Sequence, residues 1–262
     1  MLAEQLIALH ESAREGPPFT DTHAGLTPAQ GYEAARALHR HRLSRGWRAV
    51  GRKIGFTNRT IWPRYGVYEP IWGTVYDRTL IRAQGDRASV PLAGLVNPRI
   101  EPEICFGLKA PPRGGSAEAL LESLDWIAHS IEIVQSHYPN WKLRLADCTA
   151  SNGLHGRLIV GTPVPVGTLP GLMRALPAVE VELLKAGAPV DRGIASNVLD
   201  SPLLALGHFV AVLAAQPEAA PLAAGEMVST GTITDAHPVR AGETWSTRLS
   251  GLPLPGLTVD FT

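Results

Sequence analysis

The sequence predicts an α+β fold with a mostly antiparallel or mixed sheet system. Two helical patterns come first, and from residue 49 onward short β-patterned segments with glycine-rich turns alternate irregularly with a few helices. A regular strand–helix–strand alternation, typical of parallel α/β sheets, does not occur. The 262 residues suffice for one large domain or two small ones. We expect a single catalytic domain, 1–262, in which residues 1–48 form a helical N-terminal part.

The first two helices are predicted from apolar spacing and helix-breaking residues. Three leucines between residues 2 and 9 recur at helical spacing, and Gly16-Pro17-Pro18 follows them, which predicts a short first helix. A second helix is expected to begin after Thr27, because its hydroxyl can cap a first turn that opens with Pro28. This helix should end just before Gly46.

The remaining elements follow from the same patterns. Runs of β-branched and other apolar residues indicate strands, and apolar residues three and four positions apart indicate helices. In chain order we expect short strands and turns over 49–108, a helix over 116–124, strands over 126–134, 158–161 and 179–184, a helix over 202–213, and strands with tight turns over 227–261. No glycine-rich phosphate loop lies between a strand and a helix, so a nucleotide cofactor is not expected.

The composition excludes several classes of function. Lysine plus arginine (24) balances aspartate plus glutamate (24), and no basic stripe with interleaved aromatics occurs, so nucleic-acid binding is not expected. No segment reaches the roughly 18 apolar residues of a membrane span. The N-terminus lacks a basic region followed by a long apolar run, and we expect a cytoplasmic protein. Cys105 and Cys148 lie beside apolar residues and should be buried, reduced thiols.

Three glutamates form the candidate site. Glu101 and Glu103 lie two residues apart, so in a strand their side chains project from the same face. Adjacent carboxylates repel unless a cation neutralises them, and oxygen ligands suit magnesium, manganese or calcium. Glu132 lies between isoleucines in an expected core strand, where a carboxylate must be paired or metal-bound. Pro102 cannot donate to a ladder, which predicts an edge strand or a bulge at this point.

A structural interpretation of the same residues stays open on spacing alone. Glu101 and Glu103 would then lie on a solvated face, and Glu132 would pair with an arginine. A protein stabilised by calcium, without catalysis, is a further alternative.

Six segments carry a family resemblance: GRKIGFT (51–57), EPIWG (69–73), PRIEPEI (98–104), IEIV (131–134), NWKLRLAD (140–147) and VSTGTIT (228–234). Together they resemble the fumarylacetoacetate hydrolase superfamily, and within it the branch of 2-hydroxypentadienoate hydratases and oxalocrotonate decarboxylases. They follow the order and spacing of that family from about residue 25 to the C-terminus. The set is specific to the superfamily and less specific to one reaction.

This resemblance implies a fold built around a curved mixed β-roll, with helices at the N-terminus and the periphery. It implies that Glu101, Glu103 and Glu132 hold one Mg²⁺ or Mn²⁺ ion, with positions left for water or substrate. The implied activity is that of a lyase, a hydratase adding water to a 2-hydroxy-2,4-dienoate or 2-oxo-enoate from aromatic catabolism. A small 2-oxo acid is the expected substrate, because its carboxylate and keto oxygens can chelate such an ion.

Further residues receive expected roles in this framework. Lys53, in a glycine-flanked strand, is the first candidate for an acid, base or oxyanion-stabilising group; a surface lysine is the alternative. His155 can titrate near neutral pH and activate water, or it is structural. The expected substrate-binding residues are Thr230, Thr234, Asn152 and Lys142, although a turn threonine and a structural lysine are equally open interpretations.

Three departures from the family pattern bear on the reaction. Ile71 occupies a position that is acidic in the hydratases and decarboxylases, and it cannot transfer a proton. Glu69 or Asp77 are the candidates to replace that acid, although they also suit a solvated position and a turn. Gln135 stands where many relatives carry aspartate, and residues 152–156 replace a run of small residues. These departures concern the substrate and the reaction rather than the fold.

The alternatives within enzymes are a 2-oxo acid decarboxylase of the oxalocrotonate type and a C–C hydrolase of acylpyruvates. Outside enzymes, the alternative is a catalytically silent partner subunit. The expected assembly is a homo-oligomer, which can associate with a related pathway enzyme.

Overall fold

A computed structural model describes residues 2–59, 62, 67–114 and 116–262 of the chain. Within these residues, nine strands form the larger of two sheets. They are β1 (Ala49–Gly55), β2 (Ile71–Tyr76), β3 (Leu80–Arg82), β5 (Arg99–Leu108), β6 (Leu124–Val134), β7 (His155–Val160), β8 (Val164–Pro165), β11 (Met227–Ser229) and β12 (His237–Pro238). The main path runs β2-β1-β11-β5-β6-β7-β3, while β8 pairs with β6 and β12 with β5.

The smaller sheet has five strands among the described residues, in the order β10-β9-β13-β14-β4. They are β4 (Arg87–Val90), β9 (Glu180–Lys185), β10 (Ala188–Ile194), β13 (Thr244–Ser250) and β14 (Thr258–Phe261). Most neighbouring strands are antiparallel, but β1 with β11, β3 with β7, and β4 with β14 are parallel. The predicted mixed sheet system is therefore confirmed.

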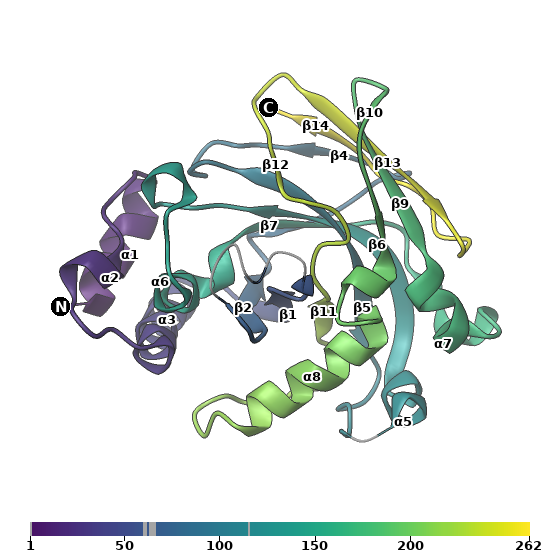
Figure 1. Cartoon of the computed structure of the whole chain (residues 1–262), viewed down its shortest axis with the longest axis horizontal. Helices are drawn as coiled ribbons and strands as arrows, with labels where there is room; N and C mark the ends of the chain where they lie inside the picture. The colour runs from purple at the N-terminus through teal and green to yellow at the C-terminus, as the bar shows by residue number, and fades with distance from the viewer. Residues whose placement is uncertain (1, 60–61, 63–66, 115) are drawn as a thin grey trace.

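The two curved sheets face one another and enclose a shared apolar core (Figure 1). Ile100, Ile131 and Ile133 of the larger sheet pack with Val259 and Phe261 of the smaller one, and all five side chains are at most 2% exposed. Side chains alternate between the two faces of a strand, so burial of Ile131 and Ile133 on this side turns Glu132 to the opposite face.

Helices cover the ends of this sheet system: α1 (Leu2–Ser12), α2 (Phe19–Thr22), α3 (Pro28–Ser44), α5 (Ala117–Glu122), α6 (Leu145–Ala150), α7 (Leu172–Ala175) and α8 (Pro202–Ala214). Figure 1 shows α1, α2, α3 and α6 grouped beside β1 and β2, whereas α8 runs along the lower side of the view with α5 near its right-hand end. The predicted cap of α3 is present. The Thr27 hydroxyl accepts from the Gln30 backbone N–H at 3.3 Å, and the Gln30 side chain accepts from the Thr27 N–H at 2.9 Å.

The prediction that the strand around Pro102 lies at an edge or a bulge is wrong. β5 lies inside the larger sheet, paired with β6 without a shift from Arg99 to Gly107. On its other side it pairs with β12 and β11, which are separated by the irregular residues 230–236. The Pro102 carbonyl accepts from the Ile233 N–H in that segment at 2.9 Å. The N–H and C=O of a strand residue point the same way, so the side of Pro102 that lacks an N–H donor faces the irregular residues 230–236 rather than a regular strand.

The predicted helices and strands are present at the expected places. The apolar spacing did not indicate the short helices α2, α6 and α7 or the strands β8 and β10. Cys105 and Cys148 are free and buried, as expected. Within the described ranges, no helix has both the length and the apolar character needed to cross a bilayer.

Candidate active site

Three glutamates converge on one face of β5 and β6. Glu101 and Glu132 are direct partners in the antiparallel register, and Glu103 lies two residues along β5 on the same face. One carboxylate oxygen from each residue lies within 4.8 Å of those from the other two. Glu103 and Glu132 are fully buried, whereas Glu101 is partly exposed and lines a cavity. The sheet therefore fixes the carboxylates as one cluster.

The two oxygens of Glu103 have different surroundings. Its Oε2 accepts hydrogen bonds from the Ser229 hydroxyl at 2.6 Å and from the Gly231 backbone N–H at 3.0 Å. Its Oε1 is buried and accepts no hydrogen bond from the described residues. The hydrogen bonds to Oε2 thus fix the orientation of the carboxylate, and Oε1 is left free to bind another group.

Lys53 and His155 hold Glu132 from two sides. Lys53 lies on β1, is 2% exposed, and places its Nζ 3.0 Å from Glu132 Oε2. The same Nζ donates to the Gly153 carbonyl at 2.8 Å. Nδ1 of His155 lies 2.8 Å from Glu132 Oε1, and its Nε2 lies 2.8 Å from the Thr79 hydroxyl. Because an ionised carboxylate only accepts, Nδ1–H is the donor to Glu132.

Burial and repulsion shift the protonation equilibria of this cluster. Burial raises the pKa of Glu101 to about 7, and burial together with the two other carboxylates raises the pKa of Glu103 well above its usual range. Burial acts on Glu132 too, but the Lys53 ammonium and His155 outweigh it and lower the pKa of Glu132. The carboxylates likewise outweigh burial at Lys53 and raise its pKa. One ammonium cannot neutralise three carboxylates, so the cluster needs more positive charge.

The donor set fits a hard divalent cation. Besides Glu103 Oε1, the buried Oε2 of Glu132 makes no hydrogen bond within the described residues, although it lies in ion-pair distance of Lys53. Buried carboxylate oxygens without donors require a counter-charge. Carboxylate oxygens are the ligands that Mg²⁺, Mn²⁺ and Ca²⁺ prefer. Three carboxylates occupy only part of such an ion's coordination shell, so a ligand with two oxygens could complete it.

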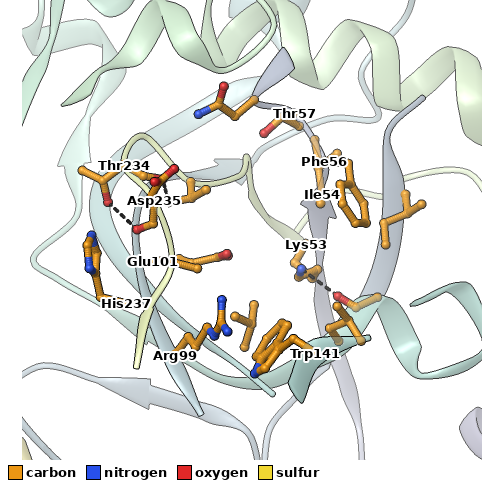
Figure 2. A pocket seen from close by; sticks show the side chains of 18 of the residues that line it. Lys53, Ile54, Phe56, Thr57, Arg99, Glu101, Trp141, Thr234, Asp235 and His237 are labelled. Atoms are coloured by element: carbon orange, nitrogen blue, oxygen red, sulfur yellow. Dashed lines mark hydrogen bonds between the residues drawn. The ribbon is translucent and has the colours of Figure 1, made fainter. Parts of the chain in front are cut away.

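A cavity of about 280 Å³ opens beside the cluster. Figure 2 shows Glu101 near its centre, Lys53 and Phe56 to one side, and Thr234 with His237 to the other. The fully buried Glu103 and Glu132 do not line it. A small molecule in the cavity would therefore meet Glu101 and the Lys53 ammonium first.

One side of the cavity is apolar and the other is polar. The residues of the apolar side belong to a single hydrophobic cluster, part of which lies behind the cavity wall. The members of this cluster that line the cavity are Ile71, Leu154, Phe56, Trp141 and Leu143. The polar side is lined by Arg99, Thr232, Thr234, Asp235 and His237. The cavity is thus shaped for an amphiphilic ligand, with a charged end near Glu101 and a hydrocarbon part.

The two predicted substrate-binding threonines occupy different positions. Thr234 lines the cavity, and its hydroxyl donates to the Asp235 carbonyl at 3.0 Å, which leaves its lone pairs able to accept. The Thr230 hydroxyl donates to the Ile104 carbonyl at 2.9 Å, and Thr230 is not among the cavity-lining residues. Only Thr234 is therefore brought to the cavity surface.

Asn152 and Lys142 also lie away from this surface. The Asn152 side chain accepts from the Thr74 N–H at 2.8 Å and donates to the Thr74 carbonyl at 3.0 Å. It thereby anchors the turn that presents the Gly153 carbonyl to Lys53. Lys142 is exposed and lines a neighbouring hollow.

The departures from the family pattern have clear structural positions. Ile71 lies on the apolar side of the cavity and is 2% exposed. Glu69 and Asp77, the candidates to replace an acid at position 71, do not line the cavity. Glu69 is exposed, and the Asp77 carboxylate accepts hydrogen bonds from the backbone N–H and the Nε of Arg48, both at 3.0 Å. The Gln135 side chain accepts from the Val96 N–H at 3.1 Å and donates to the His155 carbonyl at 3.3 Å, so it supports the buried network.

Three cavity residues were missed by the sequence analysis. Arg99 lies two positions before Glu101 on the same strand, so the alternation that grouped the glutamates could have included it. Its guanidinium lies 4.3 Å from the centroid of the Trp141 ring. Trp141 and His237 reach the cavity from a tight turn and from the two-residue β12, for which sequence periodicity gives no signal.

Comparisons with known proteins agree with this geometry. No protein-family model matches the chain. A 2-hydroxyhexa-2,4-dienoate hydratase of Comamonas testosteroni is 30% identical over 95% of this chain and 92% of its own length. The solved 4-oxalocrotonate decarboxylase of Pseudomonas putida G7, complexed with magnesium and adipate, is 27% identical and superposes with a TM-score of 0.86 over 99% and 98% of the two chains.

A structure with lower sequence identity has a similar fold. Fumarylpyruvate hydrolase of Pseudomonas aeruginosa, complexed with Mn²⁺ and pyruvate, is 14% identical and has a TM-score of 0.61 over 81% of this chain and 89% of its own. It shows that the curved sheet system is shared beyond the hydratases and decarboxylases. The chain therefore belongs to the hydratase and decarboxylase branch of the fumarylacetoacetate hydrolase superfamily.

Proposed function

We propose that this protein is a divalent-metal-dependent hydratase, a lyase that adds water to a 2-hydroxy-2,4-dienoate through its 2-oxo-enoate form in aromatic catabolism. One observation carries the proposal: three clustered glutamates lie beside a cavity that has an apolar wall, and Glu103 and Glu132 each have a buried oxygen that accepts no hydrogen bond from the described residues. The similarity to dienoate hydratases over nearly the whole chain supports the same reaction class.

Glu101, Glu103 and Glu132 are the proposed ligands of one Mg²⁺ or Mn²⁺ ion. The magnesium complex of the similar decarboxylase supports this choice, as does the all-oxygen donor set. When bound, the ion would polarise the keto oxygen of a chelated 2-oxo acid. Ser229 and the Gly231 N–H fix the orientation of Glu103 toward it.

Lys53 is the proposed donor to negative charge that develops on the substrate's C2 oxygen. Glu132 and the Gly153 carbonyl hold its ammonium beside the cavity, so the group is oriented before substrate arrives. Preorganised donors of this kind stabilise a developing oxyanion more than mobile water does. Asn152 contributes indirectly, because it anchors the turn that carries Gly153.

The remaining predicted residues receive roles that follow from their positions. Thr234 is proposed to donate its hydroxyl hydrogen bond to the substrate carboxylate in place of the Asp235 carbonyl. Thr230 is proposed to fix the loop between β11 and β12, and His155 to hold Glu132. Lys142 is proposed to attract anionic substrate toward the cavity from the adjacent hollow.

A decarboxylase of 2-oxo dicarboxylic acids is the second candidate. Arg99 lines the cavity and makes no ion pair shorter than 4 Å within the described residues, so it could bind a second carboxylate. The apolar wall favours the hydratase, because a distal carboxylate placed against Ile71 or Leu143 would be desolvated.

Product analysis tests the proposal. The protein is incubated with 2-hydroxypenta-2,4-dienoate or 2-oxohex-3-enedioate, with and without Mg²⁺ or Mn²⁺, and products are resolved by mass. We expect metal-dependent addition of water to the dienoate, abolished by chelation. Metal-dependent release of carbon dioxide from the dicarboxylate, without hydration, would instead establish the second candidate.

Three expectations stay predictions: a single catalytic domain over residues 1–262, a homo-oligomeric assembly that can associate with a related pathway enzyme, and a cytoplasmic location.

A further inference from the structure

A histidine–aspartate pair lies at the polar side of the cavity. Nε2 of His237, on β12, lies 2.7 Å from Oδ2 of Asp191, on β10 of the smaller sheet. The same Oδ2 also accepts from the Asp235 backbone N–H at 3.1 Å. An ionised carboxylate only accepts, so His237 carries its proton on Nε2 and leaves Nδ1 as the basic nitrogen.

His237 is available to a ligand in the cavity. It lines the cavity together with Glu101 and Thr234, and Figure 2 shows it beside Thr234, across Glu101 from Lys53. Its Nδ1 makes no hydrogen bond to any described residue. Asp191 and His237 are each about one quarter exposed, so the pair lies at the cavity rim rather than in the core.

Among the described residues that line the cavity, His237 supplies the imidazole, and the carboxyl groups belong to Glu101, a proposed metal ligand, and to Asp235. Ile71 lines the cavity with an apolar side chain, which cannot transfer a proton. Lys53 is fixed by Glu132 and by the Gly153 carbonyl, and a guanidinium such as that of Arg99 only donates hydrogen bonds. A neutral imidazole can accept a proton near pH 7, and a carboxylate on its other nitrogen stabilises the imidazolium that forms.

We propose that His237, oriented by Asp191, is the proton-transfer residue of the hydration step. As the water oxygen bonds to C4 of the 2-oxo-3-enoate, Nδ1 takes one water proton, and the C3=C4 π electrons shift toward C2 and its oxygen. The imidazolium then returns a proton to C3, so that one H₂O is added in total and His237 is regenerated. This role rests on the proposed hydratase function.

A purely structural role makes a different prediction. The pair also links β12 to the β9–β10 hairpin, so its loss could loosen the loop that carries Thr234. Such a change would impair substrate binding and every chemical step alike, and added imidazole would not reverse it.

The test compares His237→Gln and His237→Ala with the wild-type protein, and with His208→Gln, an exposed histidine on α8. Ketonisation of 2-hydroxypenta-2,4-dienoate is followed by deuterium uptake at C5, and hydration by product mass. We expect both His237 variants to lose hydration at least about 100-fold, a size typical of general acid–base groups. Ketonisation, Mn²⁺ affinity and thermal midpoint should stay near wild type, and imidazole should restore hydration to His237→Ala.

The outcomes separate the two proposals. Hydration by His237→Gln within about threefold of wild type overturns the role of His237 and leaves the hydratase function intact. Equal loss of ketonisation and hydration without imidazole rescue also overturns it, in favour of the structural link. Absence of hydration by the metal-loaded wild type, with Mn²⁺ bound, overturns the hydratase function and this role with it.

Discussion

Glu101 and Glu132 are direct cross-strand partners on β5 and β6, so the sheet itself holds two carboxylates at a separation that favours repulsion. Glu103 adds a third, and the buried Lys53 ammonium contacts the cluster. The arrangement costs stability unless a cation is bound, which is the physical reason to regard it as a site rather than as an ordinary part of the core.

Replacement of Lys53 should impair chemistry more than substrate binding. In Lys53→Met the apolar stem is kept and the ammonium is lost, so charge on the substrate's C2 oxygen loses a fixed donor. We expect kcat to fall about 100- to 1,000-fold, the range seen when one oxyanion donor is removed. Steady-state kinetics on the dienoate, with the exposed Lys109→Met as control, measure this. A rise in KM at unchanged kcat would show that Lys53 only binds substrate.

Loss of His155 should weaken the metal site although His155 is not a proposed ligand. Its Nδ1–H fixes one oxygen of Glu132 at 2.8 Å, and removal frees that carboxylate to rotate. Partners that orient a metal-binding side chain typically contribute 10- to 100-fold to affinity. We expect the Mn²⁺ dissociation constant of His155→Ala to rise by about that factor, as measured by calorimetry. An unchanged constant would mean that Lys53 alone orients Glu132.

The apolar wall should select the substrate's far end. A dienoate with a terminal methyl group gains contact with Ile71 and Leu143, whereas a terminal carboxylate loses its hydration there. We expect kcat/KM for 2-hydroxyhexa-2,4-dienoate to exceed that for a dicarboxylate analogue by more than about tenfold, from competition assays. Ile71→Asn should narrow this ratio, and the volume-similar Ile71→Val should preserve it. Preference for the dicarboxylate would assign Arg99 the dominant role.

Protonation of buried histidines should lower the free energy of unfolding as the pH drops from 7 toward 4. Burial, together with the nearby Arg42 charge, lowers the pKa of His137 to about 4, and burial lowers the pKa of His10 as well. Between pH 4 and 6.5 the unfolded chain therefore binds protons that the folded one does not, and stability is lost on acidification. Each such histidine contributes a slope of about 1.4 kcal/mol per pH unit there.

Urea unfolding at pH 7 and pH 5 checks this slope. We expect His137→Gln to reduce the difference between the two free energies of unfolding, and the exposed His208→Gln to leave it unchanged. Equal pH dependence in His137→Gln and wild type would contradict the assignment to His137.

Local sequence rules identified most elements and the shared face of Glu101 and Glu103, because both depend on spacing within one strand or helix. Glu132 lies on another strand, and its place in the same cluster followed from the family resemblance. Thr27 caps α3 through its own neighbours, and the same-face position of Glu101 and Glu103 follows from strand periodicity alone. Pro102 was misplaced because its effect depends on which strand lies beside it. The absent N–H of Pro102 faces the irregular residues 230–236, where β5 has no regular strand partner between β11 and β12. No local sequence pattern reveals this interruption of the sheet.

The positions of single side chains around the cavity were less predictable for the same reason. Thr230 and Thr234 lie four residues apart in one irregular loop, yet only Thr234 reaches the cavity. His237 joins Asp191 from a different sheet, 46 residues earlier in the chain. Such pairs are set by tertiary packing, which periodicity and family resemblance do not encode.

The central claim is that Glu101, Glu103 and Glu132 bind one catalytic divalent ion. Titration of Mn²⁺ into the metal-free protein, followed by electron paramagnetic resonance, tests it most directly, with Glu103→Gln and the exposed Glu122→Gln measured in parallel. We predict one tight site per chain in wild type and Glu122→Gln, weakened at least about tenfold in Glu103→Gln, and hydration activity that rises in step with bound Mn²⁺. Equal Mn²⁺ binding by Glu103→Gln, or full activity in the metal-free protein, would contradict the account.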